Sequence, residues 1–165
     1  MLIATHDYPD PDCLAAALGM QHLLSHWGVA GTTIAHGGFV GRLENRAMVE
    51  LTQISTTPVT QVRLADHDRV VLVDAFPGNG NVSIPPGYPI HAVIDHHPRP
   101  RGRTLPPACF TDIRTEIAAT STIIAHYLFQ AQCPVPPVLA TALFYGIKTD
   151  NAQGLAGASD EDLAA

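Results

Sequence analysis

The sequence contains few charged residues and few cysteines. Only 9 Lys and Arg and 15 Asp and Glu occur in 165 residues, or 15% of the chain, against about 25% in an average domain. With a formal net charge of -6, broad contact with a nucleic-acid backbone is disfavoured, because such contact needs many Lys and Arg side chains. The three cysteines, Cys13, Cys109 and Cys133, form no CxxC pair. This argues against both a disulfide framework and a thiolate zinc site.

Long apolar runs are also lacking. The longest mostly apolar stretch, Val138–Ile147, is about half of the ~20 residues that a helix needs to span a bilayer. A secretory signal peptide begins with a basic segment, and no such segment precedes Leu2-Ile3-Ala4. The sequence therefore does not predict a signal peptide. We therefore expect a reduced, cytoplasmic protein that does not associate with membranes.

The chain is instead rich in hydrophobic residues, which make up 46%, and in His, of which there are nine. Short apolar runs alternate with helical patterns, which predicts one domain with an α/β fold, its mainly parallel sheet flanked by helices. The expected strands are Met1–Thr5, Thr32–Ala35, Arg69–Val73 and Ala92–Ile94. The expected helices are Leu14–Trp27, Leu43–Leu51, Thr120–Gln130 and one from Pro136-Pro137 to near Gly146, with Pro77–Pro89 irregular.

Acidic and His side chains follow the ends of several apolar runs. In parallel sheets the carboxyl ends of the strands bind ligands, so we expect these side chains to meet in one crevice. Asp150 is expected there at the end of a strand or a strand-like segment over 144–149. The residues concerned are His6, Asp10, Asp12, Asp74, His96 and Asp150.

Carboxylates crowded into one crevice repel each other, and divalent cations remove that cost. Imidazole and carboxylate ligands without thiolate favour Mn²⁺, with Mg²⁺ or Co²⁺ as alternatives. Six ligands shared between two ions leave positions for water and substrate, and Asp74, after the most apolar run, is the natural bridge. A single Asp after a strand is usually a turn residue or a helix cap. Here, however, four successive apolar runs are each followed by an Asp or a His. Turn chemistry alone does not readily explain this pattern.

The same residues fall into four ordered motifs that resemble those of the DHH phosphoesterase superfamily over nearly the whole chain. The motifs are His6-x-x-x-Asp10-x-Asp12, Val73-Asp74, Asp95-His96-His97 and Gly146-Ile147-x-Thr149-Asp150. Within the superfamily, two further segments are most similar to nanoRNase/pAp phosphatase (bifunctional oligoribonuclease) proteins. These segments are Gly37–Arg42 with Glu44-Asn45-Arg46, and Ala119–Thr122.

The resemblance implies a role for each motif residue. His6 and Asp10 would bind the first Mn²⁺, and Asp74 would bridge to the second. The ligands of that second ion would be Asp12, His96 and Asp150. Asp95 would orient a ligand His by a hydrogen bond, and His97 would stabilise the scissile phosphate or protonate the leaving oxygen.

Arginines near the motifs are candidates for phosphate binding, since the guanidinium fork matches phosphate oxygens. Arg99 and Arg101 follow the His96-His97 pair in a Pro-rich segment, which is equally consistent with a solvated loop. Arg42 and Arg46 are candidates through the subfamily resemblance.

We therefore expect a Mn²⁺-dependent phosphoesterase acting on short oligoribonucleotides or pAp, without long duplex nucleic acid as a partner. One alternative is a related phosphohydrolase acting on pyrophosphate, polyphosphate or a cyclic dinucleotide. Another is a metal- or nucleotide-binding module without catalysis, or the inactive half of a two-domain enzyme. A homodimer is compatible with the sequence.

The resemblance also implies a second domain. Superfamily members carry a C-terminal DHHA1 domain that holds the substrate, and nothing in residues 1–165 resembles it. The C-terminal segment Ser159-Asp160-Glu161-Asp162 has the form of a helix capping box, with only a few residues after it. We expect residues 1–165 to form one catalytic domain, cut short before the substrate-binding domain.

Overall fold

The computed structural model describes residues 1–99, 101–107, 109–151 and 158–165. Its centre is a six-stranded sheet in the order β3-β2-β1-β4-β5-β6, and every neighbouring pair is parallel. The strands are β1 (Leu2–Ala4), β2 (Thr33–His36), β3 (Thr56–Pro58), β4 (Val70–Val73), β5 (Ala92–Asp95) and β6 (Phe110–Ile113).

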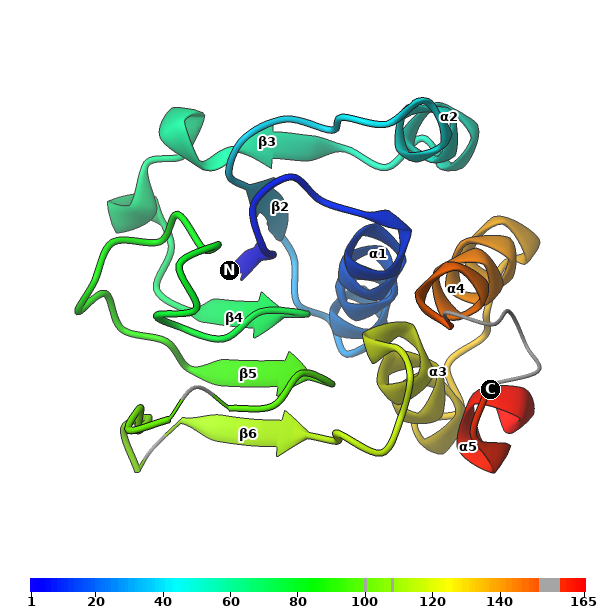
Figure 1. Ribbon diagram of the computed structural model, residues 1–165. Helices are drawn as coiled ribbons and strands as arrows, with labels where there is room; N and C mark the ends of the chain where they lie inside the picture. Colours follow the sequence, from blue (N-terminus) through cyan, green and yellow to red (C-terminus); the bar gives the residue numbers. More distant parts are fainter. Residues whose placement is uncertain (100, 108, 152–157) are drawn as a thin grey trace.

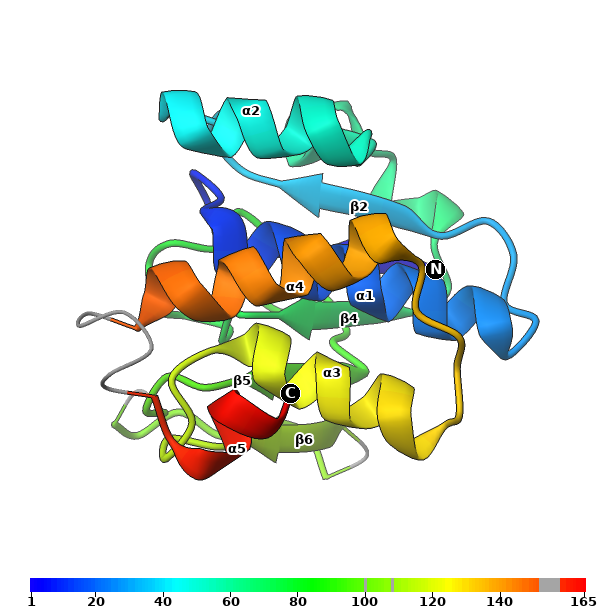
Figure 2. The same cartoon turned by 90° about the vertical axis from the view of Figure 1, so that its right-hand side faces the viewer.

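The main helices lie together on one side of the sheet. Figure 1 shows α1, α3 and α4 beside the strands, and Figure 2, turned by 90°, shows them in front of the sheet. The α-helices of the described residues are α1 (Pro11–His26), α2 (Leu43–Thr52), α3 (Thr120–Gln130), α4 (Pro137–Asp150) and α5 (Asp160–Ala164). Short 3-10 turns over η1 (Val59–Gln61) and η2 (Leu64–Asp66) lie between β3 and β4. The α/β fold with a parallel sheet and flanking helices is confirmed.

The two faces of the sheet are covered by different kinds of structure. Ile3, Val71 and Ile94 face the helices and belong to a large core with α1, α3 and α4. Their neighbours in the strands point to the other face, where Val70 and Leu72 pack on apolar side chains of loops. Because both faces are buried, the strands read as continuous apolar runs without alternation.

The expected end of α4 near Gly146 is wrong, since the helix continues to Asp150. Gly146 is a point of close helix contact rather than a helix end. A Cβ there would lie 2.6 Å from Ser121 Oγ, 3.1 Å from Asp12 Cα and 3.2 Å from Ala15 Cβ. Gly146 thus lets α4 approach the starts of α1 and α3.

Other boundaries also differ from the sequence prediction. Helix α1 begins at Pro11 instead of Leu14, because the side chain of Asp10 accepts a hydrogen bond from the N–H of Cys13 and caps the first turn. Pro11 is favourable at the first helical position. The short edge strands β3 and β6 were not predicted. The Ser159 capping box is confirmed at the start of α5.

No helix among the described residues combines the length and the hydrophobicity that crossing a membrane requires.

Candidate metal centre

The order of the strands places a switch point between β1 and β4. From β1 the chain passes through α1 to β2 on one side, and from β3 it returns to β4 on the other side of β1. At such a point the connections diverge, and the carboxyl ends of the two strands border a ligand-binding crevice. His6 follows β1 and Asp74 follows β4, so both lie at this crevice.

The first group of potential metal ligands consists of His6, Asp10, Cys13 and Asp74, whose donor atoms lie within 4.8 Å of one another. His6 Nε2 lies 3.6 Å from Asp10 Oδ2 and 3.4 Å from Asp74 Oδ2. The other ring nitrogen, Nδ1, lies 2.9 Å from the carbonyl oxygen of Asp7. Because a carbonyl can only accept, Nδ1 carries a proton, and in the neutral ring Nε2 directs a lone pair at the carboxylates.

The second group consists of Asp12, His96 and Asp150. His96 Nε2 lies 3.1 Å from Asp150 Oδ2. Asp12 is fully buried, and its two oxygens accept hydrogen bonds from the backbone N–H groups of Thr120 at 2.7 Å and Ser121 at 2.8 Å. These amides belong to the first turn of α3, where the helix dipole favours negative charge. Asp150 reaches the group from the last residue of α4 and not from a strand end, which corrects the sequence prediction.

Asp74 connects the two groups. Its Oδ2 lies 3.4 Å from His6 Nε2, and its Oδ1 lies 3.6 Å from His96 Nε2. The side chain is buried, and Thr120 Oγ1 donates a hydrogen bond to Oδ1 at 2.7 Å. The backbone of Asp74 has a φ of 56°, a left-handed conformation that is uncommon for residues other than glycine and that recurs at functional sites. Each oxygen of this carboxylate thus faces a different imidazole.

Asp95 and His97 form a hydrogen-bonded pair beside these groups. His97 also belongs to a third set of potential metal ligands with Asp74 and His96, and its Nδ1 lies 3.7 Å from Asp74 Oδ1. His97 Nδ1 lies 2.9 Å from Asp95 Oδ1, and the backbone N–H of His97 donates to the same oxygen at 3.1 Å. The resemblance implies that Asp95 orients a metal-binding His; in the structure its partner is His97, and the role of Asp95 stays a prediction. Asp95 is fully buried, whereas half of the His97 side chain is exposed.

The electrostatics of the centre favour added positive charge. Burial opposes protonation of His6 and His96, but the nearby carboxylates outweigh it and raise both pKa values, that of His96 to about 9. Burial and the charge of Asp74 raise the pKa of Asp12 well above its usual range. These three side chains thus bind protons more strongly than free side chains do, and cations can take the place of those protons.

The residues present fit divalent metal ions. His96 Nε2 is buried and has no hydrogen-bond partner among the described residues, although Asp150 is near. Burying a polar atom costs free energy unless it forms a hydrogen bond or binds a metal ion. Imidazole and carboxylate donors suit Mn²⁺, Mg²⁺ or Co²⁺. Asp74 is placed to serve both groups, so the six residues predicted as ligands are brought together as two adjoining sets.

Cys13 was not predicted as part of the centre. The sequence contains no CxxC pair that would mark it as a ligand, yet its thiol joins the first group. Burial raises the pKa of this thiol to about 11. Its position three residues after Asp10, in the first turn of a helix that Asp10 caps, was the available signal.

The four predicted phosphate-binding arginines are exposed and lie on two different segments. Arg42 is the N-cap residue of α2, and Arg46 lies in the first turn of this helix. Arg99 and Arg101 lie in the loop after β5. Within the described part of the chain, no hydrogen bond or ion pair links their side chains to the two metal groups, so their role stays a prediction.

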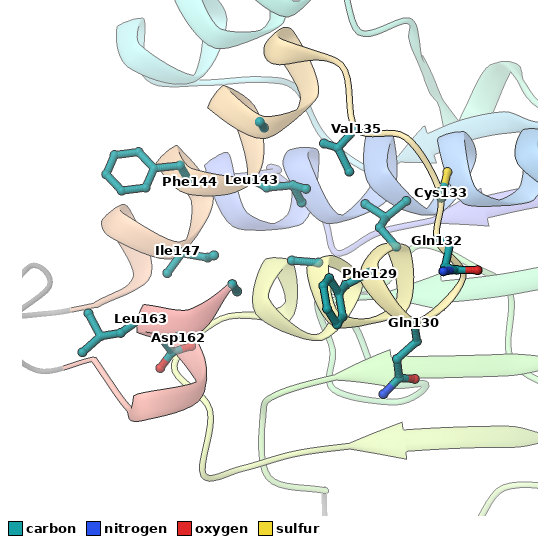
Figure 3. A pocket seen from close by; sticks show the side chains of 14 residues that line it. Phe129, Gln130, Gln132, Cys133, Val135, Leu143, Phe144, Ile147, Asp162 and Leu163 are labelled. Atoms are coloured by element: carbon teal, nitrogen blue, oxygen red, sulfur yellow. The ribbon is translucent and has the colours of Figure 1, made fainter.

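A groove of about 760 Å³ lies between α3, α4 and α5, apart from the two metal groups (Figure 3). Its lining is mainly apolar and includes Phe129, Val135, Leu143, Phe144 and Leu163. It offers few groups for chemistry, and the metal centre is the stronger candidate site.

Comparisons with known proteins agree with this geometry. The model of the DHH family, N-terminal domain, matches residues 1–147. An uncharacterized protein of Methanocaldococcus jannaschii is 36% identical over 151 residues, which cover 91% of this chain and 30% of that protein.

A crystal structure of an exopolyphosphatase-related protein from Bacteroides fragilis is similar in fold. It has a TM-score of 0.71 at 18% sequence identity and covers 99% of this chain and 52% of that one. The chain thus spans about a third to a half of the length of these two proteins.

Proposed function

This chain belongs to the DHH family, N-terminal domain, and on that basis we propose that it is a metal-dependent phosphoesterase that hydrolyses short oligoribonucleotides or pAp. The observation that carries the proposal is the shared carboxylate of Asp74. It faces His6 with one oxygen and His96 with the other, at 3.4 Å and 3.6 Å. Two ions that share one carboxylate are the usual arrangement for in-line displacement at phosphorus.

Each ion would have its own ligands besides Asp74. His6 and Asp10 would hold one, with Cys13 adjacent. Asp12, His96 and Asp150 would hold the other. When bound, divalent cations lower the pKa of water and neutralise the charge on phosphate oxygens. We propose Mn²⁺ as the native metal, with Mg²⁺ or Co²⁺ as substitutes.

His97 and Asp95 would handle the proton of the leaving group. The Nδ1 atom of His97 is hydrogen-bonded to the carboxylate of Asp95. This contact fixes the orientation of the imidazole and leaves Nε2 for the substrate. The hydrogen bond that His97 Nδ1–H donates to Asp95 raises the pKa of His97, against the effect of burial. The protonated form is therefore more populated near neutral pH, as donation to a leaving oxygen requires.

A short substrate suits the small number of basic side chains. The chain has only nine Lys and Arg, whereas a long backbone footprint needs many such contacts. We propose that Arg42, Arg46, Arg99 and Arg101 contact substrate phosphates. The parent protein would supply a DHHA1 domain that completes substrate binding, and a homodimer is a further proposal.

The test is the cleavage of a 5′-labelled RNA dimer and of pAp with and without Mn²⁺. Asp95→Asn and His97→Gln should lower kcat by about 100-fold, since proton transfer contributes on this order, and should leave Mn²⁺ binding intact. His26→Gln, on the exposed end of α1, is the matched control and should retain full activity. Equal activity of Asp95→Asn and the unaltered protein would contradict the role given to the pair.

The same assay separates the rival functions. Cleavage of pyrophosphate, polyphosphate or a cyclic dinucleotide, without cleavage of RNA or pAp, would favour the alternative suggested by the name of the Bacteroides protein. Binding of Mn²⁺ without any cleavage would identify a non-catalytic module. If a longer form with the next domain then cleaved both nucleotides, the chain would be the catalytic half of a two-domain enzyme.

A further inference from the structure

Two aromatic side chains are exposed on the loops that follow β1 and β2, at the same edge of the sheet as the metal groups. Tyr8 is 63% exposed and Phe39 is 65% exposed. Their ring centroids are 5.4 Å apart, and the ring planes stand at 88°. We propose that Tyr8 and Phe39 bind the nucleobase of the substrate. This inference rests on the proposed function and extends it, because it requires a substrate that carries a base.

The position of Tyr8 in the chain ties it to the first metal group. It stands two residues after His6 and two residues before Asp10. Its Cα therefore lies within roughly 7.6 Å of the Cα of either residue, since successive Cα atoms are about 3.8 Å apart. Phe39 follows the end of β2, at the same edge of the parallel sheet. Both aromatic residues therefore lie on the edge of the sheet that carries the metal groups.

The backbone holds the Tyr8 ring in place. Tyr8 has a φ of 56°, and its N–H donates a hydrogen bond to the carbonyl oxygen of Gly37 at 3.0 Å. A Cβ at Gly38 would lie 2.6 Å from the Tyr8 ring, so only glycine leaves room for it there. The preceding residue, Asp7, accepts hydrogen bonds from the N–H of Ser83 at 3.0 Å and from its Oγ at 2.9 Å. The backbone that carries the ring is thus fixed by hydrogen bonds, while the ring itself stays exposed to a ligand.

The chemistry of the pair selects for a base. Every nucleobase has a π face, and stacking on aromatic side chains binds bases with little regard for sequence. Two rings at right angles can receive a base face on one ring and a base edge on the other. Inorganic pyrophosphate and polyphosphate have no π face, so the pair offers them nothing. The pair therefore favours nucleotides over inorganic phosphates.

The variants for the test are chosen to preserve the backbone. Tyr8→Asn removes the ring with a residue that tolerates a positive φ. Phe39→Leu keeps an apolar side chain and removes the π system. Phe129→Leu, at a ring that is 84% exposed on α3, is the matched control. Mn²⁺ affinity and Tm are measured for each variant, to show that fold and metal centre are intact.

The readout is the Kd of AMP and of inorganic phosphate, each from an NMR titration of the Mg²⁺-loaded protein. Tyr8→Asn and Phe39→Leu should each weaken AMP binding by about five- to 100-fold, whereas phosphate binding and the Phe129→Leu control should not change. Equal weakening for AMP and phosphate, or no weakening for AMP, would overturn the inference. Binding does not require turnover. If ring-dependent AMP binding occurs but neither this chain nor a longer form with the next domain shows Mn²⁺-dependent cleavage, the proposed function fails and the base site stands.

Discussion

At the scale of single residues, Asp74 combines a costly backbone conformation with a central place in the site. Its φ of 56° puts a residue with a Cβ into the left-handed region, which costs about 1–2 kcal/mol. The backbone N–H of Asp74 is bonded to Ile94 at 2.8 Å and its carboxylate to Thr120 at 2.7 Å. These contacts stabilise a positive φ that is otherwise unfavourable for a residue with a Cβ.

This strain can be measured by comparing Asp74→Gly with Asp74→Ala. Both variants remove the carboxylate, and we expect both to lose tight Mn²⁺ binding. Without metal, the glycine variant should be more stable than the alanine variant by about 1 kcal/mol, because only glycine adopts a positive φ freely. Chemical unfolding in the presence of a chelator gives the two free energies. Equal stability would show that the backbone at this position is not strained.

At the scale of elements, the close approach of α4 to α1 and α3 positions the second metal group. Gly146 is the contact point, and Asp150 follows one turn later on the same helix. A Cβ at Gly146 would lie 3.1 Å from the backbone Cα of Asp12, an atom that a side-chain rotation cannot move.

A methyl group at Gly146 should therefore push α4 away. We expect Gly146→Ala to destabilise the protein by about 1–3 kcal/mol, as overpacking typically does, and to weaken Mn²⁺ binding through displacement of Asp150. Lys148→Ala, at an exposed position of the same helix, is the control and should change neither quantity. Thermal unfolding and a Mn²⁺ titration provide the two measurements. If Gly146→Ala changed neither the stability nor Mn²⁺ binding, α4 could move without disturbing the site.

The docking of α5 depends on one buried carboxylate. Asp162 accepts hydrogen bonds from the N–H of Ala118, from Thr122 Oγ1, and from the N–H and Oγ of Ser159. Burial alone would raise the pKa of Asp162, but these donors outweigh it and lower the pKa below the usual value. The ionised form is thus the one that the fold stabilises.

This shift predicts a pH dependence. Because the folded pKa lies below the unfolded one of about 3.9, the stabilisation by Asp162 is complete above the unfolded pKa and is lost as the pH falls through the folded pKa. Asp162→Asn should cost about 1–3 kcal/mol at neutral pH, and the difference from the unaltered protein should shrink towards pH 3. Unfolding at several pH values tests this, with the exposed Asp160→Asn as control. A difference that grew in acid would contradict the assignment.

The elements that could be predicted were those with strong local signals. Continuous apolar runs gave β1, β4 and β5, and the Ser159 capping box gave the start of α5. The edge strands β3 and β6 were missed because they are short and only partly buried. The end of α4 was misplaced because the glycine at its predicted end serves a tertiary contact, which local sequence does not encode.

The metal centre was predictable where topology decides it. His6, Asp74 and His96 follow three parallel strands, whose carboxyl ends must share one edge of the sheet. Which element carries Asp150 depends on how the helices pack. Which His forms a hydrogen bond with Asp95 depends on the rotamers that the side chains adopt. Cys13 and the Tyr8–Phe39 pair likewise became visible only through distances in space.

At the scale of the whole molecule, the metal centre joins segments that are far apart in sequence. Its candidate ligands come from the loop after β1, from the start of α1, from the ends of β4 and β5 and from the end of α4. Cations bound there would hold these elements together and neutralise their carboxylates. Ions that bind only the folded state raise its stability by mass action.

Saturating Mn²⁺ should therefore raise the unfolding temperature. At 100 times the Kd, one site contributes about 2.7 kcal/mol, which corresponds to a rise of roughly 5–11 °C for a domain of this size. Thermal scans with Mn²⁺ and with a chelator measure the shift. The double variant His6→Ala/Asp150→Ala, which weakens both groups, should lose most of it. An equal shift in the double variant would place the ions elsewhere.

The contact between Asp12 and the first turn of α3 has a practical consequence. The carboxylate of Asp12 accepts hydrogen bonds from the backbone N–H groups of Thr120 at 2.7 Å and Ser121 at 2.8 Å. A change in the charge of this carboxylate must alter both hydrogen bonds, and with them the chemical shifts of the two amide protons. These resonances are therefore built-in spectroscopic reporters, by which occupancy of the site can be followed without any substrate.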